Sequence, residues 1–130
     1  EYNRNTEKKL QRIIFACDEI AEVLDKTGLT KQQKDEISKI ESELSIIARQ
    51  GRAFGIHLVL ATQRPDAAIL NGQIRNNIDT RICGRADNVL SQIILDNTDA
   101  SDKIAKSSQG RFLTNSGKIF QAYWFDENIL

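Results

Sequence analysis

The first half of the chain contains two short apolar runs that predict buried strands. Residues 12–17 (RIIFAC) and 56–61 (IHLVLA) each end abruptly in polar residues. The second run lies between Gly55 and Pro65, and such a run is typical of a strand buried in a parallel sheet. In open α/β sheets, ligands bind just outside the carboxyl ends of the strands. The polar residues after each run are therefore candidates for a binding site.

Between these strands, the spacing of apolar residues predicts one long amphipathic helix. The apolar positions recur every three or four residues, which gives a helix one apolar face. These positions are Ile37, Ile40, Leu44, Ile47 and Ala48. Thr30 is a suitable cap for a helix that begins near Lys31, reaches about Arg52 and stops at Gly55. A shorter helix is expected over 20–24, directly after the first strand.

Shorter elements are expected in the second half of the chain. They are a helix over 67–76 interrupted by Gly72, a strand over 80–84, a helix over 89–95 capped by Asp87 or Asn88, and hairpin strands over 110–113 and 119–125 around Asn115-Ser116-Gly117. This order predicts an α/β fold, with a mostly parallel sheet flanked by helices and a C-terminal β-hairpin. Roughly three parallel strands make a thin sheet for a free-standing domain, so we expect the chain to be the second half of something larger.

Composition narrows the class of protein without naming a function. The 130 residues are 40% hydrophobic and 28% charged, which is a normal globular balance and enough for one domain with a modest core. The formal net charge of zero gives no global attraction to nucleic acid or membrane. The absence of Met, including at position 1, suggests a segment of a longer protein. Cys17 and Cys83 are interpreted as buried free thiols, with a disulfide or a metal site as the alternative.

Asp18 and Glu19 directly follow the first strand. In a P-loop ATPase, an acid at the tip of a strand beside the phosphate loop holds the hydration shell of Mg²⁺. The next acid can polarise the attacking water as a general base. The alternative is structural, because two acids can also cap the following helix and complement its dipole. Taken alone, the pattern leaves both interpretations open.

Residues 62–65 (TQRP) follow the second strand. At the tip of a neighbouring strand, the Gln63 amide can bond both the γ-phosphate of a nucleotide and the water that attacks it. The alternative is an ordinary loop in which Pro65 starts the next helix. If the two strands are adjacent, Asp18, Glu19 and Gln63 are expected at the same edge of the sheet.

Arg49 and Arg52 lie at the end of the long helix. They can stabilise the carboxyl end of that helix electrostatically, by about 0.3–1 kcal/mol each. Alternatively, one of them projects from the subunit surface into the ATP site of a neighbouring subunit as an arginine finger.

Basic residues of the second half are candidates for a strip that faces DNA. These residues are Arg75, Arg81, Arg85, Lys103, Lys106 and Arg111. Their spacing is irregular, so a solvated surface is the default interpretation.

One motif is missing from the sequence: the phosphate-cradling pattern G-x-x-x-x-G-K-[ST] does not occur. If the protein is a P-loop ATPase, its Walker A half lies upstream of Glu1.

Five blocks of this sequence resemble, in order, the later half of the motor domain of the FtsK/SpoIIIE family. The blocks are 12–25 (RIIFACDEIAEVLD), 48–66 (ARQGRAFGIHLVLATQRPD), 72–82 (GQIRNNIDTRI), 93–96 (IILD) and 109–113 (QGRFL). The resemblance covers nearly the whole chain from Arg12 to Asp126, and the segment 51–65 is highly specific. It implies a partial RecA-like fold, with residues 1–130 as the C-terminal part of one ATPase domain from the Walker B strand onward.

The resemblance assigns roles to individual residues. Asp18 and Glu19 match the Walker B acids, so that Asp18 would act on Mg²⁺ through water and Glu19 would be the base. Gln63 matches the polar sensor and, with Thr62, would contact ATP. Arg52 matches the arginine finger that acts in trans. The sequence departs from the family over 83–92 (CGRADNVLSQ), where a sensor Lys is usual and where Arg85 is a candidate substitute.

The family implies an ATP- and Mg²⁺-dependent motor that moves double-stranded DNA as a homo-hexameric ring. Such a motor would serve chromosome segregation or conjugative transfer, together with other division or conjugation proteins. It would be cytoplasmic, with the parent protein anchored to the inner face of the cell membrane. The alternatives are the ATPase of a protein secretion system and a non-catalytic fragment that only packs into an assembly. Without the Walker A half, the fragment alone is expected to be inactive.

Overall fold

The structure is a computed structural model that describes residues 5, 7, 10–63 and 72–123. The chain divides into two compact units, residues 1–78 and residues 79–130. Each unit has its own hydrophobic cluster.

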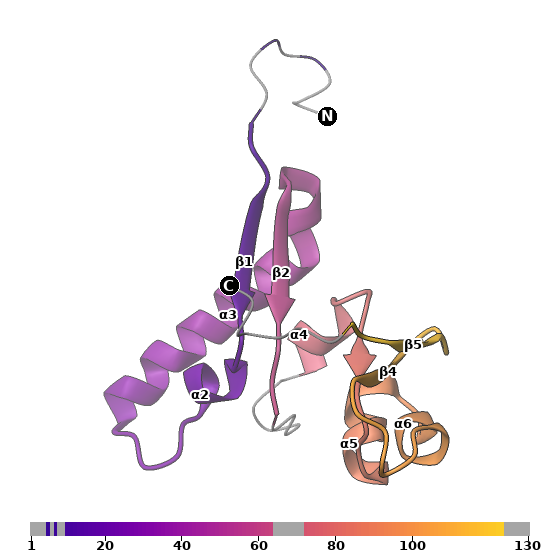
Figure 1. Cartoon of the computed structure of the whole chain (residues 1–130). Helices are drawn as coiled ribbons and strands as arrows, with labels where there is room; N and C mark the ends of the chain where they lie inside the picture. The colour runs from indigo at the N-terminus through magenta and orange to yellow at the C-terminus, as the bar shows by residue number, and fades with distance from the viewer. Residues whose placement is uncertain (1–4, 6, 8–9, 64–71, 124–130) are drawn as a thin grey trace, which may run out of the picture. The chain divides into compact units, whose positions relative to one another are not determined.

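The described residues of the first unit form a two-stranded parallel sheet and three helices (Figure 1). The elements are β1 (Ile13–Cys17), α2 (Ile20–Leu24), α3 (Lys31–Phe54), β2 (Ile56–Leu60) and α4 (Gly72–Asn76). The strands pair in register from Ile13 opposite Ile56 to Cys17 opposite Leu60. The two predicted strands, their adjacency and the two helices between them are confirmed.

Helix α3 begins and ends where its sequence signals predict. The Thr30 hydroxyl accepts a hydrogen bond from the backbone N–H of Gln33, and the Gln33 side chain accepts one from the Thr30 N–H, which makes a capping box. At the other end, Gly55 adopts the left-handed conformation, with φ of 75°. Such a residue commonly terminates a helix, and glycine adopts it without strain. The chain then enters β2 directly.

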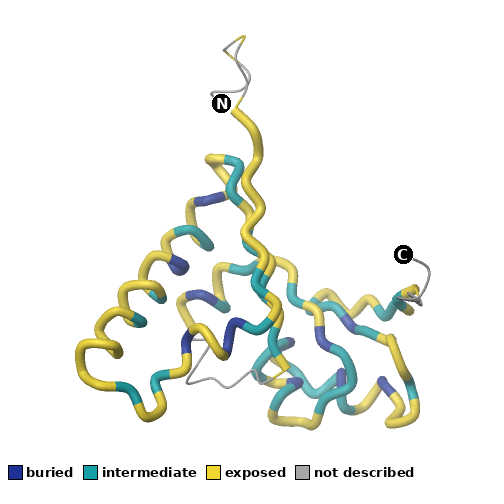
Figure 2. The backbone as a smooth tube through the Cα atoms, turned by 60° about the vertical axis from the view of Figure 1, so that its left-hand side comes forward, coloured by how far each residue is buried: buried dark blue, intermediate teal, exposed yellow. Residues whose placement is uncertain are grey.

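One face of the β1–β2 sheet packs against helices, whereas many other residues of the sheet are exposed to solvent. The buried cluster of the first unit is formed by Ile20, Leu24, Leu44 and Ile74. Cys17, Leu58 and Leu60 pack against this cluster from the strands. Most residues of β1, by contrast, are exposed, and the tube in Figure 2 is yellow there. Ile13 is 58% exposed and Ile14 is 68% exposed.

The second unit contains a three-stranded antiparallel sheet and two helices. The elements are β3 (Ile82–Cys83), α5 (Asn88–Leu95), α6 (Asp99–Lys103), β4 (Arg111–Thr114) and β5 (Ile119–Gln121). The strand order is β3-β4-β5, and both pairs are antiparallel. The predicted hairpin of β4 and β5 is confirmed, as is α5, whose cap is Asp87.

The prediction that the strand over 80–84 adds to a mostly parallel sheet is wrong. Its strand, β3, pairs antiparallel with β4. The sequence analysis missed α6, and the two helices α5 and α6 connect β3 to β4. Antiparallel pairing joins β3 to the β4–β5 hairpin, so β3 belongs to that sheet and not to the parallel pair of β1 and β2. The described chain is therefore a mixed α/β fold with a small parallel sheet and a separate antiparallel sheet.

Packing in the second unit is completed by a buried hydroxyl. The apolar cluster consists of Cys83, Leu95, Ala100, Ile104 and Leu113. Ser91 is fully buried beside it, and its Oγ donates a hydrogen bond to the Asn97 carbonyl at 2.7 Å. The same Oγ accepts one from the Ala100 N–H at 3.1 Å. This hydroxyl therefore ties α5 to the start of α6.

Some sequence predictions fall outside the described residues. They concern most of 1–10, residues 64–71 with Pro65 and the first part of the helix expected over 67–76, and residues 124–125 of the last strand. Within the described part, α4 begins at Gly72, the residue at which an interruption was expected.

Candidate functional site

Asp18 and Glu19 directly follow β1, and backbone hydrogen bonds to Ala61 flank them on both sides. The Ala61 N–H donates to the Cys17 carbonyl at 2.8 Å, and the Ile20 N–H donates to the Ala61 carbonyl at 2.9 Å. Asp18 and Glu19 lie between these two bonds. Both acids are therefore fixed at the carboxyl end of the parallel strand pair, the position where α/β sheets bind ligands.

Glu19 joins the tips of the two strands. Its Oε1 accepts a hydrogen bond from the Ala21 N–H at 3.2 Å, which caps α2. Its Oε2 accepts one from the Gln63 N–H at 2.9 Å, across 44 positions of sequence. The capping interpretation of Glu19 is thus correct, and the expected meeting of the acids with Gln63 at one edge is also correct.

The polar side chains at this edge differ in how far they are exposed to solvent. Asp18 and Gln63 are exposed, whereas Glu19 and Thr62 are half-buried. A carboxylate oxygen has two lone pairs, and each Glu19 oxygen uses one of them in its hydrogen bond with a backbone N–H. The edge therefore offers two carboxylates, a hydroxyl and an amide, which suits a hydrated Mg²⁺ ion and an attacking water.

A metal site made of protein ligands alone is not found in the part of the chain that the structure describes. There, no three His, Cys, Asp or Glu side chains come close enough to hold an ion. An acid that acts on Mg²⁺ through water needs no such cluster, because Mg²⁺ keeps several waters and takes other ligands from phosphates. Asp18 fits that arrangement.

Arg52 lies at the other end of the first unit from the acids. It belongs to the last turn of α3, which precedes Ile56 at the start of β2. Asp18 and Glu19 follow Cys17, which pairs with Leu60 at the far end of the strands. Five strand residues separate these ends by about 17 Å at about 3.3 Å per residue. Arg52 therefore does not reach the acids of its own chain.

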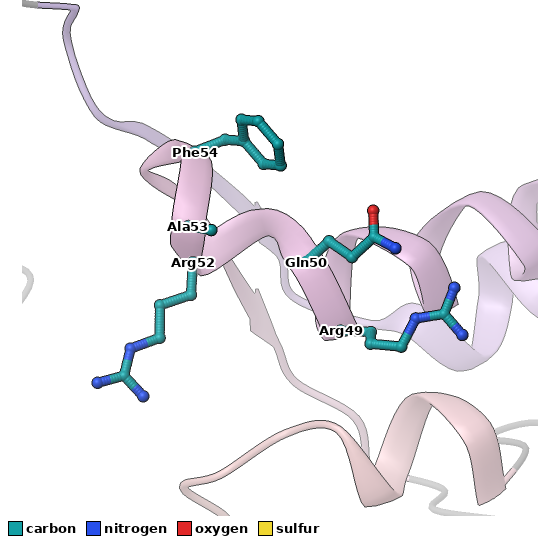
Figure 3. Close-up of a pocket in the computed structure, with 5 residues that line it drawn as sticks. All are labelled: Arg49, Gln50, Arg52, Ala53 and Phe54. Carbon is teal, nitrogen blue, oxygen red and sulfur yellow. The ribbon is translucent and has the colours of Figure 1, made fainter. Parts of the chain in front are cut away.

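The last turns of α3 form an exposed surface. A shallow hollow there is lined by Arg49, Gln50, Arg52, Ala53 and Phe54 (Figure 3). Phe54 is 73% exposed although it is aromatic. Figure 3 shows Phe54 and Arg52 extending from the last turn to different sides. The buried residue of this part of the helix is Gly51, which faces β2.

Several basic residues of the second unit contact that unit itself. Arg81 pairs with Asp96 at 2.5 Å, and Lys103 pairs with Asp99 at 2.7 Å. The Arg85 guanidinium donates a hydrogen bond to the Ser101 carbonyl in α6. These contacts give Arg81, Arg85 and Lys103 partners within their own unit. A sensor role for Arg85 and a basic strip that faces DNA stay predictions.

Both cysteines are free thiols, as predicted, but the predicted burial is correct only for Cys83. Cys83 is buried, and its burial raises the pKa of the thiol because the thiolate loses solvation. Cys17 is half-buried at the end of β1.

Sequence reasoning missed the bond between Glu19 and the Gln63 backbone, the close approach of Gly51 to β2 and the exposure of Phe54. The 44-residue separation of the first pair leaves no local signal. The sequence does hold a signal for Phe54, because this aromatic residue lies between Arg52 and Gly55, the glycine that terminates the helix.

Comparison with known proteins finds that this chain is similar to parts of DNA translocases. It is 31% identical over 127 residues to the DNA translocase FtsK of Haemophilus influenzae, which covers 95% of this chain and 22% of that protein. It is 38% identical over 89 residues to DNA translocase FtsK 2 of Ralstonia nicotianae, which covers 68% of this chain and 10% of that protein. No family model matches the chain.

Two solved structures share the fold. The pCW3 conjugation coupling protein TcpA, in a monomer form with ATPγS, is 42% identical with a TM-score of 0.88, over 99% of this chain and 37% of that one. The cytoplasmic domain of the type VII secretion ATPase EccC of Thermomonospora curvata is 23% identical with a TM-score of 0.61, over 85% of this chain and 12% of that one. At this identity, EccC shows the fold alone.

The chain belongs to the FtsK/SpoIIIE family of translocases. It spans about a fifth or less of the length of the two curated relatives and about a third of the TcpA chain. Among the described residues, no helix is long and apolar enough to cross a membrane.

Proposed function

We propose that this chain is the C-terminal part of a RecA-like ATPase domain in a motor that moves double-stranded DNA. The observation that supports this most is the edge where Glu19 accepts a hydrogen bond from the Gln63 N–H. It brings an acidic pair and an amide side chain to the carboxyl ends of two parallel strands, as ATP hydrolysis requires. The likeness to TcpA and to FtsK proteins supports nucleotide and DNA as its ligands.

Each residue of the edge has a proposed role. Asp18, which is exposed, holds the water shell of Mg²⁺. Glu19 takes a proton from the attacking water, while its bonds to two backbone N–H groups fix the direction of its carboxylate. Gln63 senses the γ-phosphate and orients the water, and Thr62 contacts the nucleotide. Bound Mg²⁺ would neutralise charge that develops on the phosphates.

Arg52 is proposed to act on the ATP site of a neighbouring subunit. The roughly 17 Å that five strand residues span keeps it from its own acids. In a ring with head-to-tail contacts, however, the α3 end of one subunit meets a different surface of the next. An arginine supplied in trans stabilises the negative charge of the transition state and is worth about 10³–10⁵ in rate in other systems.

The Walker A half of the domain is proposed to come from sequence upstream of Glu1. The exposed apolar side chains of β1 support this, because Ile13, Ile14 and Phe15 are 58%, 68% and 48% exposed. Further strands and a phosphate loop beside this sheet would cover them. The location that we propose, on the cytoplasmic side of the cell membrane, follows the family alone.

Conjugative transfer is the role that we favour, because the structure at 42% identity is that of a conjugation coupling protein. A protein secretion ATPase is the second candidate, since EccC has the same fold.

The test is an ATPase assay of the parent protein with either duplex DNA or a candidate substrate peptide. Stimulation by DNA supports our proposal, and stimulation by the peptide alone contradicts it. In the same assay, Glu19→Gln is expected to abolish turnover and to retain ATP binding.

A further inference from the structure

The Glu19 carboxylate is held between two backbone donors that differ in how firmly they are fixed. Its Oε1 accepts a hydrogen bond from the Ala21 N–H at 3.2 Å. Ala21 is 3% exposed and Ile20 before it is 1% exposed, so the core of the first unit fixes this donor. Its Oε2 accepts a hydrogen bond from the N–H of Gln63 at 2.9 Å, and Gln63 is exposed. The carboxylate is therefore shared between a donor in the core and a donor at the surface.

Gln63 differs from Ala61 in the kind of group to which it is bonded. The Ala61 N–H and carbonyl both bond to backbone, at Cys17 and Ile20. Two residues further along, the Gln63 N–H bonds to the side chain of Glu19. The terminal torsion of a glutamate side chain is broad, so its carboxylate turns with a small shift of the donor. The direction of the Glu19 carboxylate therefore follows the position of the Gln63 N–H.

We propose that the backbone N–H of Gln63 is a positioning group for the Glu19 carboxylate and links it to the binding of a γ-phosphate at the Gln63 side chain. This inference rests on the proposed function, in which Glu19 is the base and Gln63 contacts the γ-phosphate. The side-chain amide and the backbone N–H of Gln63 share one Cα, so a ligand that holds the side chain also restrains the N–H. Proton transfer stays with Glu19, and Gln63 sets its direction.

The direction of the carboxylate matters because a general base works only within hydrogen-bond reach of the proton that it takes, about 2.6–3.2 Å. A misplacement of about 1 Å can cost about 10²-fold in rate. Without the bond from the Gln63 N–H, the terminal torsion of Glu19 loses a restraint. Hydrolysis therefore becomes fast only when a bound γ-phosphate holds Gln63 in place.

The first experiment removes the N–H of residue 63 and keeps the Gln63 side chain. In the parent protein, an ester oxygen replaces this N–H, and the same replacement at Gly28 is the control. Gly28 is exposed in the turn between α2 and α3, and its N–H donates no hydrogen bond to the described residues. The ester at residue 63 is expected to lower kcat for ATP hydrolysis by about tenfold or more. The KM for ATP should stay within about twofold, because the bond acts on the base and not on nucleotide binding.

The control should keep the wild-type kcat and KM. A wild-type kcat in the ester at residue 63 overturns the proposal, and so does a loss that appears in KM alone. If the ester protein does not fold, the exchange measurement that follows decides, because it uses the unmodified backbone.

Hydrogen exchange at the Gln63 amide tests the link between the side chain and the N–H. We expect this amide to exchange about fivefold or more slowly with ATPγS than with ADP, because the γ-phosphate holds the side chain and keeps the bond to Glu19 closed. In Gln63→Ala, which keeps the N–H and lacks the side-chain amide, the difference should disappear. In Glu19→Ala, the amide should exchange faster with either nucleotide. Equal exchange with ATPγS and ADP in the wild-type protein, or an undiminished difference in Gln63→Ala, contradicts the link.

The proposed function is tested apart from this link. If Glu19→Gln keeps full turnover, Glu19 is not the base, and the proposed function fails together with the link. If Glu19→Gln loses turnover but the ester at residue 63 hydrolyses ATP at the wild-type rate, the proposed function stands and the positioning role of Gln63 is wrong.

Discussion

Gly51 allows α3 to approach β2 closely, and adding one methyl group there tests how the end of α3 is positioned. In Gly51→Ala, the new Cβ would lie 2.9 Å from the Ile56 carbonyl oxygen and 3.1 Å from Cγ2 of Ile47. An ordinary contact begins at 3.4 Å, so α3 and β2 must separate by about 0.5 Å. The oxygen belongs to the backbone and cannot turn away.

The expected cost combines two opposing effects. Overpacking costs about 1–3 kcal/mol, whereas replacing glycine by alanine within a helix gains about 1 kcal/mol. We expect a net loss of about 1–2 kcal/mol in the free energy of unfolding, because the clash is with backbone. The thermal midpoint should fall by roughly 5 °C or more. Since Arg52 is the next residue, ATP turnover should also fall by about tenfold in the assembled protein.

The assay is thermal unfolding followed by circular dichroism, with Gly72→Ala as the control. Gly72 is also helical, and its added Cβ would meet only Asn76 Nδ2, at an ordinary 3.9 Å. The control should therefore melt at or slightly above the wild-type temperature. If Gly51→Ala melts as the control does, the packing argument for the position of Arg52 is refuted.

Two further predictions concern the second unit. Ser91→Ala leaves the buried Ala100 N–H and Asn97 carbonyl without their hydroxyl partner, so the free energy of unfolding should fall by about 2 kcal/mol. Ser107→Ala, at an exposed position, should change it little in the same denaturant titration, and equal losses would contradict the role of Ser91. Burial raises the pKa of Cys83, so at pH 8 its thiol should react with a disulfide reagent more slowly than that of Cys17, and its rate should keep rising at higher pH. Equal rates in the folded protein would contradict this.

The sequence predicted the first unit better than the second, for physical reasons. Thr30, the three-four apolar spacing and Gly55 are local signals, and α3 begins and ends where they indicate. The apolar runs of β1 and β2 likewise specify strands, and a single helical crossover region makes them parallel. In the second unit, α6 has five residues, DASDK, without an apolar stripe. No apolar periodicity predicts this helix, and no local signal in the sequence shows that β3 pairs with the hairpin strand β4.

The sequence predicts which residues form the candidate site, but it does not predict the hydrogen bonds between them. Asp18, Glu19 and Gln63 follow recognisable strands, so their shared edge follows from topology. The hydrogen bond from the Gln63 N–H to Glu19 depends on how two loop ends meet after folding. The separation of Arg52 from that edge depends on the direction of α3 along the sheet, which the order of the elements already implies.

The central claim is that Glu19 and Arg52 serve two different ATP sites, and mixing of variants tests it most directly. Glu19→Gln and Arg52→Ala subunits of the parent protein are each expected to lack ATP turnover alone. In an equimolar mixture, roughly one contact in four pairs an intact Glu19 with an intact Arg52 from the neighbour, so turnover should recover toward a quarter of wild type. Recovery in mixed assemblies is the result that our account predicts. Mixed assemblies without any recovery, or full turnover by Arg52→Ala alone, would contradict it.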